Sequence, residues 1–194
     1  MHYPLCFNTR FEPFYPPYQD KIIAVIAQAQ RAHPRTLAVR LKLWLSLETL
    51  TERRHGLSAD FIDALRTSLA SYSREHNTPE SQLSYLWTRD ESRPCYHAVL
   101  FMNQDTFDTG TARTSRADSL DQLLSRTWGN VQGFSGLSTA SPFCERVDDV
   151  YLLDPNHCDC QEELNRLIWH ISDMARDRAR VTNPEARALE SSAW

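Results

Sequence analysis

The chain has 194 residues, of which 41% are hydrophobic and 24% are charged, and its net charge is −4 at pH 7. This composition is typical of a globular protein and excludes an intrinsically disordered chain. It contains no apolar run of about 18 residues, so neither a membrane-spanning helix nor a membrane partner is predicted, and the negative charge argues against general coating of nucleic acid.

The start of the chain and its cysteines indicate the compartment. The opening MHYPLCFNTRFEPFYPPYQ has no basic segment followed by an apolar core, so no signal peptide is predicted. The five cysteines are an odd number without regular spacing, which favours reduced thiols over a disulfide framework. Both features favour a cytoplasmic protein.

The basic residues are nearly all arginines, with Lys21 and Lys42 as the two lysines. They fall in local groups such as Arg53 with Arg54. The planar guanidinium suits phosphate contacts and base stacking. Solvated helix faces explain such groups equally well.

The first part of the chain predicts an arm, a helix and a strand. Residues 1–33 contain an aromatic, proline-rich arm followed by apolar residues at helical spacing. From Leu37 to Leu45 every second residue is leucine or valine, and Arg40 and Lys42 lie on the other face. This alternation is typical of a half-buried strand.

The middle of the chain predicts a second helix and a hairpin. Ser58 is a good N-cap for a helix whose apolar residues recur every three or four positions. The runs Leu83–Arg89 and Cys95–Met102 are strand-like and are joined by a short polar loop that ends in Pro94. The second run is apolar on both faces, as a central strand would be.

The last part of the chain predicts a helix from Asp118 that Gly129 closes, a strand within residues 147–153, and a final helix over Gln161–Arg180. Residues 182–194 are expected to form a tail that frays. Strands separated by helices, with an adjacent hairpin, indicate an α+β fold over residues 34–181. Its sheet is predicted to be mainly antiparallel and flanked by helices.

A candidate metal site lies at the hairpin. On a strand, residues two apart point the same way, so Cys95 and His97 should project side by side. Asp90 or Glu91 could complete a three-ligand corner for Mn, Mg or Zn, which suits metal-assisted phosphodiester chemistry. The alternative is a hydrogen-bonded core histidine beside a buried cysteine.

Two further clusters contain metal-ligand residue types. His170 and Asp173 lie three residues apart on the last predicted helix, so they could take part in a different metal site. His157, Cys158 and Cys160 surround Asp159 at the start of that helix. No second cysteine pair accompanies them, so a turn followed by an Asp159 cap is favoured over zinc.

Four runs together resemble a known family: RTLAVRLKLWL, then SYLWTRD with CYHAVLFMNQ, then SLDQLLSRTWG, then LIWHISDMARDRAR. Their order and spacing resemble the inovirus gene-II-protein-like family, also called the YagK/YfjJ C-terminal domain, over roughly Pro34 to Val181. The resemblance implies a phage or prophage protein with the fold of the HUH replication initiators. In those enzymes a histidine–hydrophobe–histidine strand holds a metal, and a helix tyrosine attacks a phosphate of single-stranded DNA and stays attached.

The metal-binding motifs of that family are only partly kept. Tyr96 and His97 match the second half of the histidine strand, whereas Cys95 stands where the first histidine is expected. Asp90 follows the tryptophan motif where the resemblance calls for glutamate. On the first strand, Lys42 stands where the resemblance implies an acid.

The nucleophile motif is also altered. The resemblance implies a serine–tyrosine pair followed by a lysine, and this chain has Ser172, Asp173 and Arg176 there. An aspartate cannot form the stable phosphotyrosine-type link that nicking and rejoining needs. No catalytic residue is therefore assigned, and Asp173 with Arg176 is a degenerate nucleophile position.

These changes predict a phage- or prophage-encoded, replication-initiator-like protein that has lost nicking and acts by binding nucleic acid or a protein partner. Two alternatives stay open: an active metal-dependent single-stranded DNA endonuclease with a substituted site, and a purely protein-binding regulator of a mobile element. A homodimer is compatible with either. No cofactor is expected, and any metal at His97, Cys95 and Asp90 is expected to bind weakly. The residues expected to contact nucleic acid are Arg40, Arg89, Arg93 and Arg176.

Overall fold

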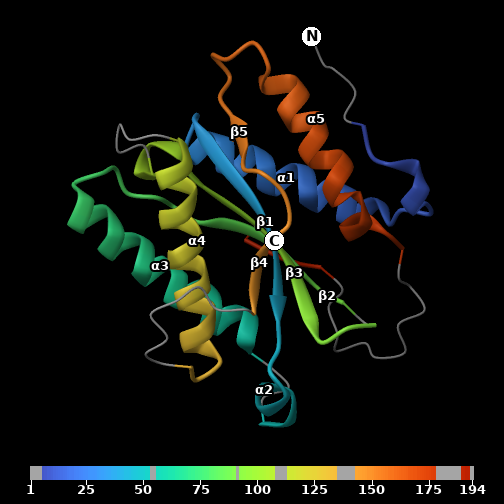
Figure 1. The fold of residues 1–194 in the computed structure, drawn as a ribbon. Coiled ribbons are helices and arrows are strands. Elements are labelled where there is room, and N and C mark those ends of the chain that lie inside the picture. Colours follow the sequence, from blue (N-terminus) through green and yellow to red (C-terminus); the bar gives the residue numbers. More distant parts are fainter. Residues whose placement is uncertain are drawn as a thin grey trace.

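A six-stranded antiparallel sheet forms the centre of the computed structural model (Figure 1). The strand order is β4-β1-β3-β2-β6, and β5 also pairs with β1. The predicted α+β class with a mainly antiparallel sheet is confirmed. The structure describes residues 6–52, 56–90, 92–107, 113–134, 143–177 and 189–192.

The strands are β1 (Thr36–Trp44), β2 (Ser84–Arg89), β3 (Cys95–Asn103), β4 (Cys144–Arg146), β5 (Tyr151–Leu153) and β6 (Glu190–Ser191). The helices are α1 (Pro16–Ala32), α2 (Leu47–Glu52), α3 (Leu57–His76), α4 (Arg113–Val131) and α5 (Cys160–Ile171). Three short 3-10 helices are η1 (Thr9–Phe11), η2 (Gln104–Phe107) and η3 (Ser172–Ala175).

Helices cover both faces of the sheet, and Figure 1 shows α3 and α4 on one side with α1 and α5 on the other. The alternation in β1 produces the two cores, because successive side chains point to opposite faces. Leu37 and Leu41 pack with α3 and α4, whereas Ala38 packs with α1 and α5. Both faces of β3 are buried as well, since Leu100 lies in the first core and Val99 in the second.

The strand register brings three polar residues together. β1 and β3 pair with Lys42 opposite His97, and β2 and β3 pair with Thr88 opposite His97. Residues directly opposite each other in an antiparallel pair project from the same face. Lys42, His97 and Thr88 therefore project from the sheet face that α1 and α5 cover. The predicted β2–β3 hairpin and its place beside β1 are confirmed.

The N-terminal arm packs against its own domain. The Phe7 and Phe14 rings lie 5.6 Å apart and pack against the core beneath α1 and α5. The backbone N–H of Tyr15 bonds to Ala175 O at 2.9 Å, and Asp177 N–H bonds to Pro13 O at 2.8 Å. The arm therefore lies alongside η3 and the residues that follow it.

This pairing corrects the predicted last helix. α5 ends at Ile171, η3 follows, and Arg176 is already extended. The arm provides partners for the backbone around Ala175, and a continuing helix could not make those hydrogen bonds. The helix over Gln161–Arg180 is therefore wrong beyond Ile171, and residues 178–180 lie outside the described part.

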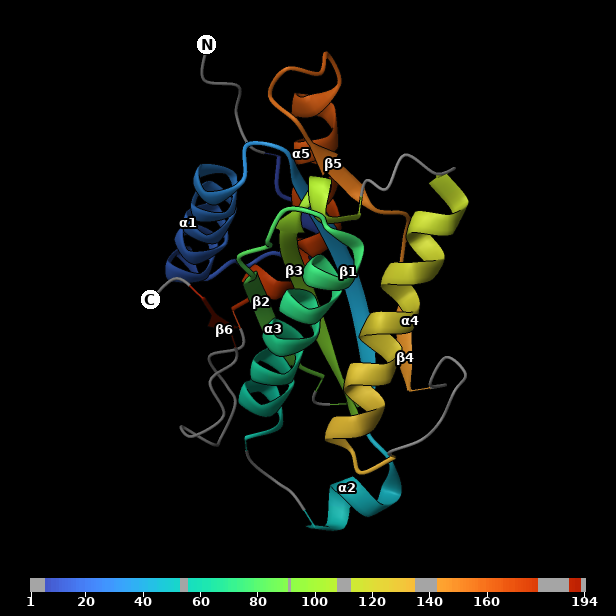
Figure 2. The same cartoon turned by 90° about the vertical axis from the view of Figure 1, so that its left-hand side faces the viewer.

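Other boundaries also differ from the sequence predictions. α3 begins at Leu57, and Gly56 rather than Ser58 is its N-cap. α4 begins at Arg113 rather than Asp118 and continues past Gly129 to Val131. The strand predicted within residues 147–153 is confined to β5. Residues 189–192 do not fray, because Leu189 is 2% exposed and β6 pairs with β2 at the sheet edge (Figure 2).

Among the described residues, no helix combines the length and the apolar character that crossing a membrane requires.

Candidate functional site

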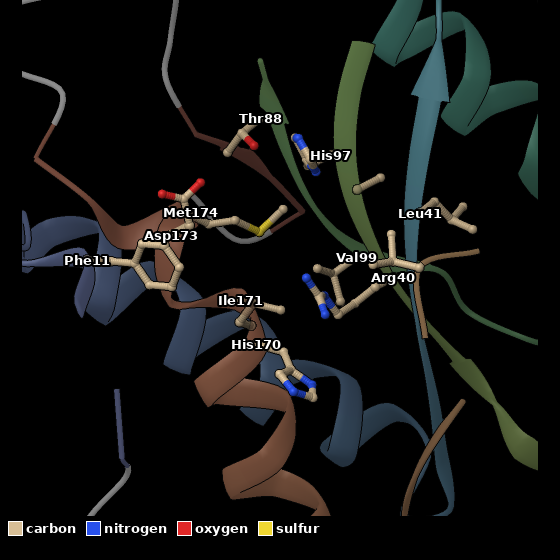
Figure 3. Close-up of a pocket in the computed structure, with 12 residues that line it drawn as sticks. Phe11, Arg40, Leu41, Thr88, His97, Val99, His170, Ile171, Asp173 and Met174 are labelled. Carbon is tan, nitrogen blue, oxygen red and sulfur yellow. The ribbon is translucent and has the colours of Figure 1, made fainter. Parts of the chain in front are cut away.

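A cavity of about 220 Å³ lies between the sheet and the α5–η3 segment. The sheet contributes Arg40, Thr88, His97 and Val99, and the α5–η3 segment contributes His170, Ile171, Asp173 and Met174. Phe11 of the arm closes one side (Figure 3). The cavity is therefore lined both by His97, from the predicted hairpin strand, and by His170 and Asp173, from the predicted last helix.

The hairpin end of this sheet face holds the predicted metal triad. His97 Nε2 lies 3.3 Å from Asp90 Oδ2, and the Cys95 thiol lies 3.9 Å from the same oxygen. One ligand atom from each of Asp90, Cys95 and His97 lies within 4.8 Å of the others. The structure thus brings together the three residues, and Glu91 lies outside the described part of the chain.

Asp90 is held as a carboxylate. Partial burial raises its pKa, but hydrogen bonds from the Ser92 hydroxyl and N–H and from His97 outweigh burial and lower the pKa to about 2. Ser92 Oγ and N lie 2.7 and 2.9 Å from Asp90 Oδ1. The carboxylate oxygens are therefore already engaged by protein groups.

The thiol of Cys95 resists the ionisation that metal binding requires. Burial raises the pKa of the Cys95 thiol, and the Asp90 carboxylate raises it further. The residue is 1% exposed. A metal needs the thiolate, so it would have to displace the thiol proton and the Asp90–His97 hydrogen bond.

The three side chains offer one sulfur, one nitrogen and one oxygen. This mixed set suits zinc better than magnesium, which prefers oxygen ligands. Lys42 is opposite His97 in the register, and its charge on the same face disfavours a cation. The residues present thus form a poor site for the magnesium or manganese chemistry that the resemblance implies.

A second polar cluster lies where β1, β5 and α5 meet. Arg40 forms an ion pair with Asp148. The Tyr151 hydroxyl donates to Asp148 Oδ2 at 2.9 Å and lies 2.6 Å from His170 Nδ1. Since the hydroxyl proton is given to Asp148, a neutral His170 donates from Nδ1 and keeps Nε2 as an acceptor.

Burial favours the neutral forms of Tyr151 and His170 in this second cluster. Burial raises the pKa of Tyr151 to about 12. Burial also lowers the pKa of His170, although Asp148 opposes the change. Tyr151 is fully buried, so its hydroxyl is a structural hydrogen-bonding group and is poorly suited to nucleophilic attack.

Asp173, the residue at the predicted nucleophile position, lies across the cavity from His97 of β3. Asp173 lies in η3, is partly buried and lines the cavity with His97. Arg176 follows η3 in an extended conformation and is exposed. The cavity therefore brings a histidine of β3 and a carboxylate of η3 together on its walls.

The arginines predicted to contact nucleic acid do not form one patch. Arg40 lines the cavity, is partly exposed and forms an ion pair with Asp148. Arg93 is exposed near Cys95, and its charge acts on the Cys95 thiol. Arg89 follows Thr88 on β2 and so projects from the opposite face, where it lies near Tyr96.

The other two predicted clusters differ in outcome. His170 and Asp173 both line the cavity but belong to no metal-binding group among the described residues. His157, Cys158 and Asp159 do form such a group, yet all three are exposed. Asp159 makes no side-chain capping bond; it accepts a bond from the Cys158 thiol at 3.2 Å. Asp159 therefore occupies the predicted N-cap position, but its side chain does not cap the helix by a hydrogen bond.

Sequence reasoning missed Phe11 as part of the cavity wall, and it missed the contacts that Asp148 and the Tyr151 hydroxyl make behind the cavity residues Arg40 and His170. Arg40 and Asp148 lie 108 residues apart in the chain, and no periodicity connects them. The one available signal was the acidic pair before Tyr151 at the start of a predicted strand.

A family model for the YagK/YfjJ C-terminal domain matches residues 8–192. The chain belongs to this family. The match includes α1 and β6, so the YagK/YfjJ C-terminal domain extends beyond the four runs that resemble the family. Comparison with curated proteins and with solved structures found no match.

Proposed function

We propose that the protein is a phage- or prophage-encoded, replication-initiator-like protein that binds single-stranded DNA without nicking it. One observation carries the proposal: His97 and Asp173 line the same cavity. In an initiator the resemblance implies a metal strand opposite a nucleophile, but here the strand has Cys95 in place of one histidine and the nucleophile position carries Asp173.

The missing nucleophile supports the loss of nicking. A tyrosine that attacks a DNA phosphate forms a phosphodiester-type link that a second hydroxyl can reverse. The corresponding link to Asp173 would be an acyl phosphate, which water hydrolyses readily and which cannot serve as a stable covalent intermediate. Tyr151 and Ser172 do not replace the tyrosine, since Tyr151 is fully buried and the Ser172 hydroxyl donates to Ile168 O at 2.7 Å.

The weakened metal corner supports the same conclusion. Cleavage of this type uses a cation to neutralise the scissile phosphate. Here Lys42 already provides a positive charge on the same face, and the thiol of Cys95 is held protonated. A lysine can contact a phosphate without activating it, so the same arrangement favours binding over cleavage.

The arginines provide the expected DNA contacts. Arg93 is exposed in the loop of the β2–β3 hairpin, and Arg176 is exposed just after η3. Arg89 projects from the sheet face opposite to the one that carries Thr88 and His97. We therefore expect Arg93 and Arg176 to contribute more than Arg89. Phosphate contacts release counterions, so the affinity should fall as the salt concentration rises.

Fluorescence anisotropy with a labelled single-stranded oligonucleotide tests the proposal. We expect binding that weakens steadily with salt, with a shallower salt dependence in Arg93→Ala and Arg176→Ala. Arg66→Ala is the matched control, because Arg66 is exposed on α3 and paired with Asp63. No salt-dependent binding at low ionic strength would refute the proposal and favour the protein-binding regulator.

A second candidate is a metal-dependent nickase with a substituted site. The observation that favours it is the approach of the Asp90, Cys95 and His97 ligand atoms to within 4.8 Å of one another. Calorimetric titration of Mn²⁺ and Zn²⁺ into the wild type and His97→Ala separates the two. Micromolar binding that disappears in the variant would favour the nickase, and weak or no binding is expected.

A further inference from the structure

The cavity between the sheet and η3 has apolar walls and polar ends. Phe11 and Met174 form the wall on the arm side, and Val99 forms the wall on the sheet side (Figure 3). Thr88 and His97 lie at one end, and His170 lies at the other. This distribution suits a flat aromatic ligand whose edges carry hydrogen-bonding groups.

The hydroxyl of Thr88 points to a polar ligand. Thr88 is 3% exposed and lines the cavity. None of the hydrogen bonds formed within the described part of the chain uses this hydroxyl. A threonine hydroxyl on the wall of a cavity can both donate to and accept from a ligand there.

The two histidines can supply further hydrogen bonds. Asp90 engages one nitrogen of the His97 ring, and an imidazole has a second nitrogen that can bond a ligand. Tyr151 engages Nδ1 of His170, so Nε2 is the nitrogen left for the cavity. The polar ends can therefore both donate and accept, as the edge of a heterocyclic base requires.

The size and charge of the cavity narrow the ligand class. Its volume of about 220 Å³ is below the roughly 300–1,000 Å³ of typical small-molecule pockets, which leaves room for one ring system rather than a whole nucleotide. Arg40 is neutralised by Asp148, and Asp173 adds a carboxylate. An isolated phosphate is therefore a poor match.

We infer that this cavity is a pocket for one unstacked nucleobase of a single-stranded nucleic acid. The Phe11 ring and the Met174 thioether contact the faces of the base, and Thr88 and the histidines bond its edges. The inference rests on the proposed function in one respect, namely that the base is presented by a bound single strand.

Two oligonucleotides of equal length and charge test the inference. One is a 5′-labelled strand that contains all four bases, and the other is a strand of abasic spacers. Phosphate contacts are the same in both, so the difference in affinity reports the bases. We expect the strand with bases to bind at least about tenfold more tightly, because one base–aromatic stack contributes an effect of this order.

Matched variants locate that difference in the cavity. Thr88→Val removes the hydroxyl at nearly constant volume, and Phe11→Ala removes one wall. Both should reduce the preference for bases at least about threefold. Thr67→Val and Tyr15→Ala are the controls, because Thr67 lies on α3 and Tyr15 is an exposed arm residue outside the cavity lining. Thermal unfolding verifies that each variant is folded.

The outcomes separate the inference from the proposed function. Equal binding of both strands, or an equal loss in the control variants, would overturn the inference and leave single-strand binding in place. If neither strand binds, the proposed function fails. Titration with the four deoxynucleoside monophosphates then decides the inference: saturable binding that Thr88→Val weakens supports the pocket, and no binding overturns it.

Discussion

The imidazole of His97 bonds to the carboxylate of Asp90, with 3.3 Å between Nε2 and Oδ2. A metal at the hairpin would have to separate this pair, whereas a base in the cavity would not. The pair therefore orients His97 towards the cavity by a protein contact. This arrangement suits a site that binds without an ion.

Removal of Asp148 should destabilise the protein. Asp148 pairs with Arg40 and accepts the hydroxyl of Tyr151, so Asp148→Asn weakens two partly buried interactions. We expect a loss of about 1–3 kcal/mol in the free energy of unfolding, measured by urea denaturation. The control is Asp63→Asn, which breaks an exposed pair with Arg66 and should change the free energy of unfolding by less than about 1 kcal/mol. Equal losses in the two variants would contradict a larger contribution from the Asp148 cluster.

The C-terminal strand should contribute to stability. Leu189 is 2% exposed and packs in the core beneath α1 and α5, so Leu189→Ala should reduce the free energy of unfolding by about 2 kcal/mol or more. Leu47, which is 83% exposed, provides the control. Leu47→Ala should change the free energy of unfolding by less than about 0.5 kcal/mol. An unaffected Leu189→Ala would mean that β6 is not held against β2.

Stability should fall at mildly acidic pH through His170. Burial lowers the pKa of His170 in the folded protein, with Asp148 opposing and Arg40 and Arg166 adding to the shift. The unfolded chain therefore binds the proton first. The stabilisation is complete above the unfolded pKa of about 6.5 and is lost as the pH falls through the lower, folded value.

Unfolding curves between pH 8 and pH 5 measure this effect. The wild type should lose more stability over that range than His170→Gln. His33, whose pKa burial also lowers, contributes in the same direction, so the comparison is made in a His33→Gln background. If His170→Gln leaves the pH dependence unchanged, His170 is not the cause of the lower stability at acidic pH.

Cys95 should react slowly with alkylating agents. Its thiol is buried and has a raised pKa, so little thiolate is accessible at pH 8. We expect iodoacetamide to modify the exposed Cys6 at least about tenfold faster than Cys95, as measured by peptide mass spectrometry. Comparable rates in the native protein would show that the hairpin opens, and rates in urea provide the reference.

Short-range periodicity explains what the sequence could predict. The alternation from Leu37 to Leu45 and the Pro94 loop identify β1 and the β2–β3 hairpin, because a period of two depends only on local residues. The same period places Cys95 and His97 on one face, and Asp90, one of the two carboxylates that the sequence offered as a third ligand, lies beside them.

Long-range pairing explains what the sequence could not predict. α5 ends at Ile171 because the arm pairs with the residues around Ala175, more than a hundred positions along the chain. Likewise, the contact between Tyr151 and His170 depends on how β5 and α5 pack. Such contacts leave no local pattern, so the cavity and its Phe11 wall were found only in the structure.

The central claim is that the protein holds single-stranded DNA without a covalent link. The most direct measurement divides one sample, containing the protein, a labelled single-stranded oligonucleotide and Mn²⁺, between a native and a denaturing gel. We predict a shifted band in the native gel and intact, unshifted oligonucleotide in the denaturing gel. A shifted, protease-sensitive band or a cleaved oligonucleotide in the denaturing gel would contradict the account, because it would show that another residue has replaced the missing tyrosine.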